Sequence, residues 1–239
     1  MHASRPFQGL GRALTILALT LGLGTAAAPT APAAAATGTL RIYLARHGQT
    51  DWNAEHRLQG SIDTHLNATG REQAAALAAR LSGLHFARVY CSRLSRTRET
   101  AEIAHGQAPI DSLAGLNEQN FGKFQGLRVD GGDSTVAAEW RRRSADPADS
   151  FDGGESLEQL FARVDATVKG IRKRHAAGNL LVVGHGNTNK MVLRSLLGLT
   201  MEQAAGIQQD NDELYLVELD PAGPPRLFKL ITEARLKEL

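Results

Sequence analysis

Short β-rich runs alternate with longer amphipathic stretches along most of this chain. The runs cover Leu40–Arg46, Phe86–Cys91, Leu180–Gly184 and Leu214–Leu219, and each is flanked by a helical pattern. Strands that alternate with helices are typical of an α/β fold in which helices cover a sheet. We therefore predict an α/β sandwich.

Helix signals fill the segments between these runs. Asn67 can cap a helix that continues through alanines to Leu81. Further helices are predicted over Ser95–Ala104 and Met191–Leu197. Another follows Gly153-Gly154-Glu155-Ser156, and its apolar face is formed by Leu157, Leu160, Phe161, Val164 and Val168.

The N-terminus has the features of an export signal. Arg5 and Arg12 precede an apolar stretch from Ala13 to Leu23, and a tract of small residues follows to Ala36. This order predicts a signal peptide plus an Ala/Pro-rich spacer over residues 1–36 and a single domain over residues 37–239. The apolar stretch is shorter than the roughly 20 residues that span a bilayer. We expect a periplasmic or secreted protein without a stable membrane anchor; an uncleaved N-terminal anchor is the alternative.

The charge balance gives no sign of a polyanionic partner. The 27 Lys and Arg residues and 25 Asp and Glu residues become 25 of each once Arg5 and Arg12 leave with the leader. The chain has no dense basic block with interleaved aromatic residues, so no nucleic acid partner is predicted. The single cysteine, Cys91, cannot form an internal disulfide. No metal is predicted either, because no Cys/His cluster and no His-x-x-x-His pair is formed by His56, His65, His85, His105 and His175.

The first β-rich run ends in Arg46-His47-Gly48. A histidine can attack phosphorus and carry it as a phosphohistidine, and an adjacent arginine offers a planar fork that bonds two phosphate oxygens. A histidine that merely ends a strand is the alternative for this tripeptide alone. Ser92 and His185 also follow predicted strands. Because open α/β sheets bind ligands beyond the carboxyl ends of their strands, we expect these segments to converge on one site.

Four ordered motifs carry a family resemblance between about Ile42 and Leu197. They are Arg46-His47-Gly48-Gln49-Thr50-Asp51-Trp52-Asn53, Ser92-Arg93-Leu94-Ser95-Arg96-Thr97-Arg98-Glu99-Thr100-Ala101, Leu116-Asn117-Glu118 with Phe121-Gly122 to Gln125-Gly126, and Gly184-His185-Gly186-Asn187. Together they resemble the histidine phosphatase superfamily, in its phosphoglycerate mutase-like branch. The resemblance implies a three-layer α/β/α sandwich with one mixed, mostly parallel central sheet, and it implies no cofactor.

The resemblance also implies roles for individual residues. His47 is the expected nucleophile, Arg46, Arg96 and His185 are expected to neutralise the phosphoryl oxygens, and the Asn53 amide is a further donor. Glu118 matches the proton donor and is expected to lie in an apolar or anion-facing setting that raises its pKa. Arg57 and Gln59 are candidates for contacting the rest of the substrate.

Each role has a structural alternative. His185 could be a satisfied strand-end histidine, and Arg96 an exposed helical arginine like Arg98. Glu118 could be a solvated loop residue, and Asn53 could cap a turn. Arg57 and Gln59 could equally lie on the surface.

The length of the segment between Gly126 and Gly153 favours a phosphatase over a phosphoglycerate mutase. Only about 26 residues separate Gly126 from Gly153, whereas similar mutases carry a long insertion there. This segment has few apolar residues, and we expect it to be an excursion over the sheet. We predict an exported, metal-independent phosphatase that acts on small phosphomonoesters. One alternative is a mutase, because Trp140-Arg141-Arg142 resembles a substrate-binding stretch of mutases. The other alternative is a non-catalytic phosphate-binding module. The oligomeric state is not readable from the sequence.

Overall fold

A mixed seven-stranded sheet forms the centre of the domain in the computed structural model, which describes residues 38–129, 133–232 and 235–238. Its strand order is β3-β2-β4-β1-β5-β6-β7. The neighbours among β1 to β4 run parallel, whereas β5, β6 and β7 are each antiparallel to the strand before them in that order. The bounds are β1 (Leu40–Arg46), β2 (Phe86–Cys91), β3 (Ile110–Ser112), β4 (Gly178–Gly184), β5 (Leu214–Leu219), β6 (Arg226–Thr232) and β7 (Arg235–Glu238).

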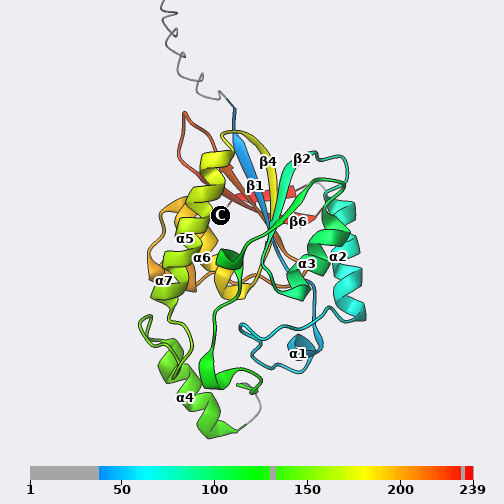
Figure 1. Cartoon of the computed structure of the whole chain (residues 1–239). Coiled ribbons are helices and arrows are strands. Elements are labelled where there is room, and N and C mark those ends of the chain that lie inside the picture. Colours follow the sequence, from blue (N-terminus) through cyan, green and yellow to red (C-terminus); the bar gives the residue numbers. More distant parts are fainter. Residues whose placement is uncertain (1–37, 130–132, 233–234, 239) are drawn as a thin grey trace, which may run out of the picture. The chain divides into compact units, whose positions relative to one another are not determined.

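Helices cover both faces of this sheet. One face carries α5 (Leu157–Arg174) and α6 (Gly186–Leu197), and the other carries α2 (Ala68–Arg80) and α3 (Ser95–Ala104) (Figure 1). The predicted three-layer α/β/α sandwich with a mixed sheet is therefore confirmed. None of the helices among the described residues is both long enough and apolar enough to cross a membrane. The leader predicted over residues 1–36 lies outside the described residues.

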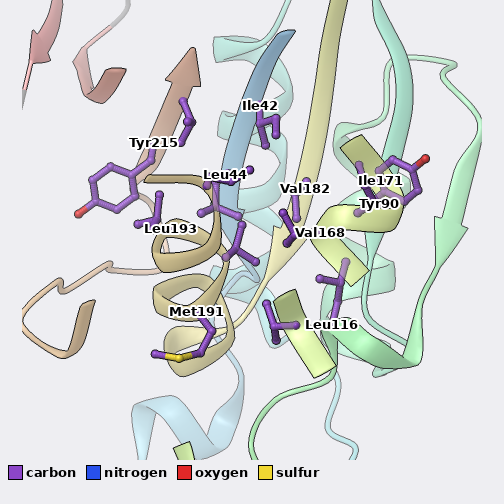
Figure 2. Packing of buried hydrophobic residues seen from close by; sticks show 14 of the residues in the cluster. Ile42, Leu44, Tyr90, Leu116, Val168, Ile171, Val182, Met191, Leu193 and Tyr215 are labelled. Carbon is purple, nitrogen blue, oxygen red and sulfur yellow. The ribbon is translucent and has the colours of Figure 1, made fainter. Parts of the chain in front are cut away.

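Alternation of side chains along the strands builds a core on each face. Ile42 and Leu44 of β1 pack with Val182 of β4 in the cluster beneath α5 and α6 (Figure 2). Tyr43 and Ala45 point the other way, into the cluster beneath α2 and α3. Because both faces are covered, the central strands are mostly apolar, with exposed Arg41 as an exception in β1, which explains why the runs are readable in the sequence.

Caps define where the helices begin. Asn67 accepts a hydrogen bond from the Gly70 amide at the start of α2, as predicted. Ser156 and Gln159 form a capping box at the start of α5. The predicted start of α6 at Met191 is wrong, because the helix begins at Gly186. Its first turn is polar, so the apolar periodicity of the helix is visible only from Met191 onward.

The segment between Gly126 and Gly153 contains a helix that the sequence analysis missed. This helix, α4 (Ser134–Ser144), lies beyond the sheet at the end where β1 leads into α1 (Figure 1). Trp140 of α4 packs against aromatic rings of neighbouring loops, namely Phe121, Phe124 and Phe151. The expected excursion is therefore a small helical unit with its own aromatic cluster. The remaining short elements are α1 (Asp51–Ala54), α7 (Met201–Ala205), η1 (Ala114–Leu116) and η2 (Gly122–Phe124).

Candidate active site

The end of β1 holds His47 in one ring orientation. Its amide donates to the Gly184 carbonyl at 3.0 Å, and its ring Nδ1 lies 2.7 Å from the Gly48 carbonyl oxygen. Since a carbonyl only accepts, Nδ1 carries the proton and Nε2 keeps a lone pair. Gly48 is required at the turn because a Cβ there would lie 2.3 Å from the Gly70 carbonyl oxygen.

The electrostatic surroundings keep the His47 ring neutral. The side chain is only 2 % exposed. Burial and the positive charges of Arg96 and Arg46 hold the pKa of His47 well below its usual value. A neutral, oriented imidazole with a free Nε2 is the form that can act as a nucleophile.

His185 lies beside His47, with the two ring centroids 5.2 Å apart. Its Nδ1 accepts a hydrogen bond from Nε of Arg96 at 3.2 Å, and its Nε2 lies 2.8 Å from the Ser92 hydroxyl. Because the guanidinium only donates, the proton of the neutral ring must be on Nε2. Burial and the charge of Arg96 lower the pKa of His185 well below its usual value.

A chain of hydroxyl groups continues from His185 into the protein. The Ser92 hydroxyl lies 2.7 Å from Thr97 Oγ1, and Thr97 in turn donates to the Leu94 carbonyl at 2.9 Å. The Leu94 amide donates back to Ser92 at 3.0 Å. Only one direction satisfies every group, namely His185 to Ser92, Ser92 to Thr97, and Thr97 to the carbonyl. The chain therefore fixes the ring tautomer of His185.

Arg46 presents unoccupied donors. Its Nη1 donates to the Gln209 carbonyl at 2.9 Å, while its buried Nε has no hydrogen-bond partner among the described residues. A buried donor without a partner costs about 1–3 kcal/mol. Such an orphan, on a guanidinium that lines a cavity, is suited to an anionic oxygen of a ligand.

Arg96 is anchored on three sides. It projects from the first turn of α3, is 1 % exposed, and donates to the carbonyl oxygens of Ile62 and Gly60, both at 2.8 Å. Burial lowers its pKa to about 10, so it stays charged at neutral pH. The alternative of an exposed helical arginine is therefore wrong.

Of the two settings expected for Glu118, apolar or anion-facing, the apolar one is wrong. Its carboxylate accepts four hydrogen bonds within 3.2 Å, from the amides of Gln119, Asn187 and Thr188 and from the Thr188 hydroxyl. Two of these amides belong to the first turn of α6, where the helix dipole also favours a negative charge. Glu118 is 8 % exposed and lines the cavity, so the alternative of a freely solvated loop residue is wrong too.

An ion pair on α5 holds the loop that carries Glu118. Arg163 pairs with Glu155 at 2.6 Å and donates to the backbone carbonyls of Gly115, Asn117 and Glu118 at 2.8–3.2 Å. The loop is thus tied to a long helix of the scaffold, which keeps the carboxylate at a defined place.

These residues surround a cavity of about 250 Å³. Seven of the eight residues predicted for the site line it, namely Arg46, His47, Asn53, Arg57, Gln59, Arg96 and Glu118. His185 does not line it, since the ring is fully buried behind Arg96. No group of three or more His, Cys, Asp or Glu side chains within residues 38–129, 133–232 and 235–238 could hold a metal ion.

The remaining predicted residues, Asn53, Arg57 and Gln59, line the cavity and also form hydrogen bonds within the protein. Asn53 Oδ1 accepts from the Thr50 amide in a capping box, so the alternative of a turn cap holds, while its Nδ2 has no partner among the described residues. Arg57 stacks on Trp52 at 4.3 Å and donates to the Gly126 carbonyl at 2.8 Å. Gln59 accepts from the Thr64 hydroxyl.

Several cavity residues were missed by sequence reasoning. They are Leu58, Gly60, Lys190, Gln208 and Gln209, whereas Phe121, Trp140 and Asn187 stand in stretches that were singled out without a site role for these residues. Only Lys190 had a readable signal, because it follows Gly186 by four residues and so lies on the same face once α6 is known to begin at Gly186. The loop residues have no periodic pattern and reach the cavity through the tertiary fold.

Comparison with known proteins gives consistent matches across the domain. The family model of the histidine phosphatase superfamily (branch 1) matches residues 42–229. A protein named "Probable phosphoglycerate mutase GpmB" from Shigella boydii serotype 18 is 34 % identical over 187 residues, which span 75 % of this chain and 85 % of that protein.

Solved structures match in fold and extent. The alpha-ribazole phosphatase from Shigella flexneri superposes with a TM-score of 0.69 at 26 % identity and covers 81 % of this chain and 97 % of its own. A mycobacterial glucosyl-3-phosphoglycerate phosphatase superposes with a TM-score of 0.68 at 25 % identity and covers 79 % of this chain and 97 % of its own.

Proposed function

This chain belongs to branch 1 of the histidine phosphatase superfamily, and from that premise we propose that it hydrolyses small phosphomonoesters through a phosphohistidine on His47. The observation that carries this proposal is the state of the His47 ring. Nδ1–H is bound to the Gly48 carbonyl, which leaves the Nε2 lone pair in a cavity where Arg46 has an orphaned donor. A phosphate-binding site needs the guanidinium, but only a nucleophile needs the oriented lone pair.

In the first step of the proposed reaction, Nε2 of His47 attacks phosphorus and the bond to the leaving oxygen breaks. Arg46 and Arg96 offset the negative charge on the phosphoryl oxygens. Glu118 gives a proton to the leaving oxygen. The products are an alcohol and phosphohistidine.

In the second step, a water molecule attacks the phosphohistidine. The Glu118 carboxylate takes a proton from that water, the N–P bond breaks, and inorganic phosphate forms. The four hydrogen bonds on Glu118 hold its carboxyl group in place for this role. His185 orients Arg96 in the free enzyme, and it can donate to a phosphoryl oxygen only after its Nδ1 takes up a proton.

The size of the site supports a small substrate. The cavity of about 250 Å³ is lined by the polar residues of the candidate site and by the apolar side chains of Leu58, Phe121 and Trp140. It fits a compact phosphomonoester rather than a folded phosphoprotein. Export through the leader of residues 1–36 is part of the proposal; N-terminal sequencing of the exported protein should find a start beyond that leader, and a start at Met1 would refute it.

Mutase activity is the second candidate, because Trp140 of the Trp140-Arg141-Arg142 stretch lines the cavity. Arg141 and Arg142 are exposed on α4 and do not line it. A mutase must also exclude water from its phosphohistidine. Adding a phosphoryl acceptor separates the two reactions: a mutase transfers phosphate to the acceptor, and a phosphatase continues to release it.

The direct test is phosphate release from a panel of phosphomonoesters with and without a chelator. We expect release that the chelator does not reduce and that His47→Ala abolishes. Release that disappears with the chelator would refute the metal-independent mechanism. If no substrate is hydrolysed while phosphate analogues still bind, the chain is a binding module.

A further inference from the structure

The cavity carries more positive charge than a phosphoryl group needs. Besides His47, its ionisable lining consists of four cations, Arg46, Arg57, Arg96 and Lys190, and one carboxylate, Glu118. Arg46 and Arg96 match the two charges of a phosphoryl dianion. Arg57 is already stacked on Trp52 and paired with a carboxylate oxygen of Glu55 at 3.1 Å. Lys190 is the remaining cation of the cavity lining, and these assignments give it no anion.

Lys190 forms no ion pair with an acidic side chain of the described residues. Its Nζ donates to the Ala205 carbonyl at 3.2 Å, and no carboxylate of the described residues lies within 4.0 Å of it. Glu118, the nearest candidate on the cavity wall, already accepts four hydrogen bonds from other groups. Burial lowers the pKa of Lys190, and the Glu118 carboxylate opposes this effect from beyond ion-pair distance. A partly buried ammonium group without a counter-ion is costly, and a bound anion offsets that cost.

Helix geometry places this ammonium group beside the reaction centre. Lys190 stands one turn after Gly186 on α6, and both residues line the cavity. Gly186 borders the reaction centre, because a Cβ at that position would lie 3.7 Å from Glu118 Oε2 and 3.9 Å from Arg46 Cζ. A leaving group that extends past Gly186 therefore meets Lys190 next.

We propose that Lys190 forms a subsite for a second anionic group, so that the preferred substrates are small phosphomonoesters whose leaving group carries a carboxylate. This inference rests on the proposed phosphatase function and names the substrate class of the same site. The competing role for Lys190 is direct contact with the transferred phosphoryl group. The two roles differ in which substrates show a lower kcat/KM when Lys190 is replaced.

The test compares 2-phosphoglycolate with its carboxamide, which has nearly the same shape but no second charge. Lys190→Met should reduce the preference in kcat/KM for the carboxylate over the carboxamide by about 10- to 100-fold, the range for one hydrogen bond between charged groups. Lys190→Arg should keep most of the preference. Lys173→Met, at an exposed position of α5, is the matched control and should leave both rates unchanged.

An equal loss on both substrates would assign Lys190 to the phosphoryl group and overturn the proposal, and so would no loss on either. Calorimetric binding of 3-phosphonopropionate and its carboxamide repeats the comparison with compounds that cannot be hydrolysed. If the wild type hydrolyses neither ester, the phosphatase proposal fails. The subsite still stands in that case if Lys190→Met weakens binding of the phosphonopropionate alone, and it falls if the two ligands are affected alike.

Discussion

Nε of Arg96 donates a hydrogen bond of 3.2 Å to Nδ1 of His185, and this contact joins two motifs that lie 89 residues apart in the chain. It also explains how the guanidinium is aimed. The remaining nitrogens of Arg96 donate to the Gly60 and Ile62 carbonyls, so the plane of the fork is fixed before any phosphate binds. Such preorganised donors account for large parts of transition-state stabilisation in enzymes.

Arg96→Lys should therefore lower kcat/KM by about 100- to 1000-fold, the usual effect of losing one preorganised donor. A single ammonium group cannot reproduce the planar fork that reaches both loop carbonyls and His185. Steady-state kinetics measures the loss, and Arg98→Lys, at an exposed position of the same helix, is the control. Near-normal activity of the Arg96 variant would contradict the assigned geometry.

Ser92→Ala should weaken the preference of the His185 ring for the tautomer with the proton on Nε2. The hydroxyl accepts the Nε2 proton of His185, and its loss leaves only the hydrogen bond from Arg96 Nε to Nδ1 to favour that tautomer. Nitrogen-15 NMR should show Nε2–H in the wild type and a mixture of tautomers in the variant. We expect kcat/KM to fall about tenfold, as for one lost hydrogen bond. An unchanged tautomer together with unchanged kinetics would rule out the hydroxyl chain as a positioning device.

Glu118→Gln should discriminate between leaving groups. An alkyl phosphate needs a proton on its leaving oxygen, so its kcat should fall by about 100- to 10,000-fold. A nitrophenyl phosphate, whose leaving group departs without a proton, should lose much less in the first step. The comparison of the two substrates under single-turnover conditions measures this difference. Equal losses would mean that Glu118 is not the proton donor.

Stability should depend on pH through the buried histidines. The pKa values of His47 and His185 are lowered in the folded protein by burial and by neighbouring arginines. The unfolded chain binds a proton at each ring near its ordinary pKa of about 6.5, and the folded chain does so only at lower pH, so the unfolding free energy falls as the pH drops below that value. Denaturant titrations at several pH values below about 6.5 give the slope of the unfolding free energy against pH. This slope should be smaller in His47→Asn than in the wild type by about 1.4 kcal/mol per pH unit. The same slope in both proteins would show that His47 titrates normally when folded.

The central layers of the fold were predictable because burial leaves a continuous signal. β1, β2 and β5 match the predicted runs at both ends, since strands covered on both faces are mostly apolar even where a charged residue such as Arg41, Arg88 or Glu218 interrupts them. β3 was missed because it is only three residues long and half-buried. The antiparallel extension by β6 and β7 was missed because it lies at the edge of the sheet, where the apolar pattern is weaker.

The candidate site was predictable in its membership and not in its electrostatics. The Arg46-His47 pair, Arg96 and Glu118 do meet in one cavity. The polar setting of Glu118 arises from backbone amides at the start of α6, which are 69 and 70 residues further along the chain and carry no side-chain signal. Lys190 was hidden for the same reason, because its orientation depends on where α6 begins.

The most direct test of the account is the stereochemical course of hydrolysis at phosphorus. The substrate would be a phosphorothioate monoester made chiral with two oxygen isotopes, hydrolysed in water that carries the third isotope, and the configuration of the released thiophosphate would be read. Two successive in-line displacements, the first by Nε2 of His47 and the second by water, each invert the centre. The account therefore predicts overall retention of configuration; inversion would mean that water attacks the substrate directly and that no phosphohistidine forms.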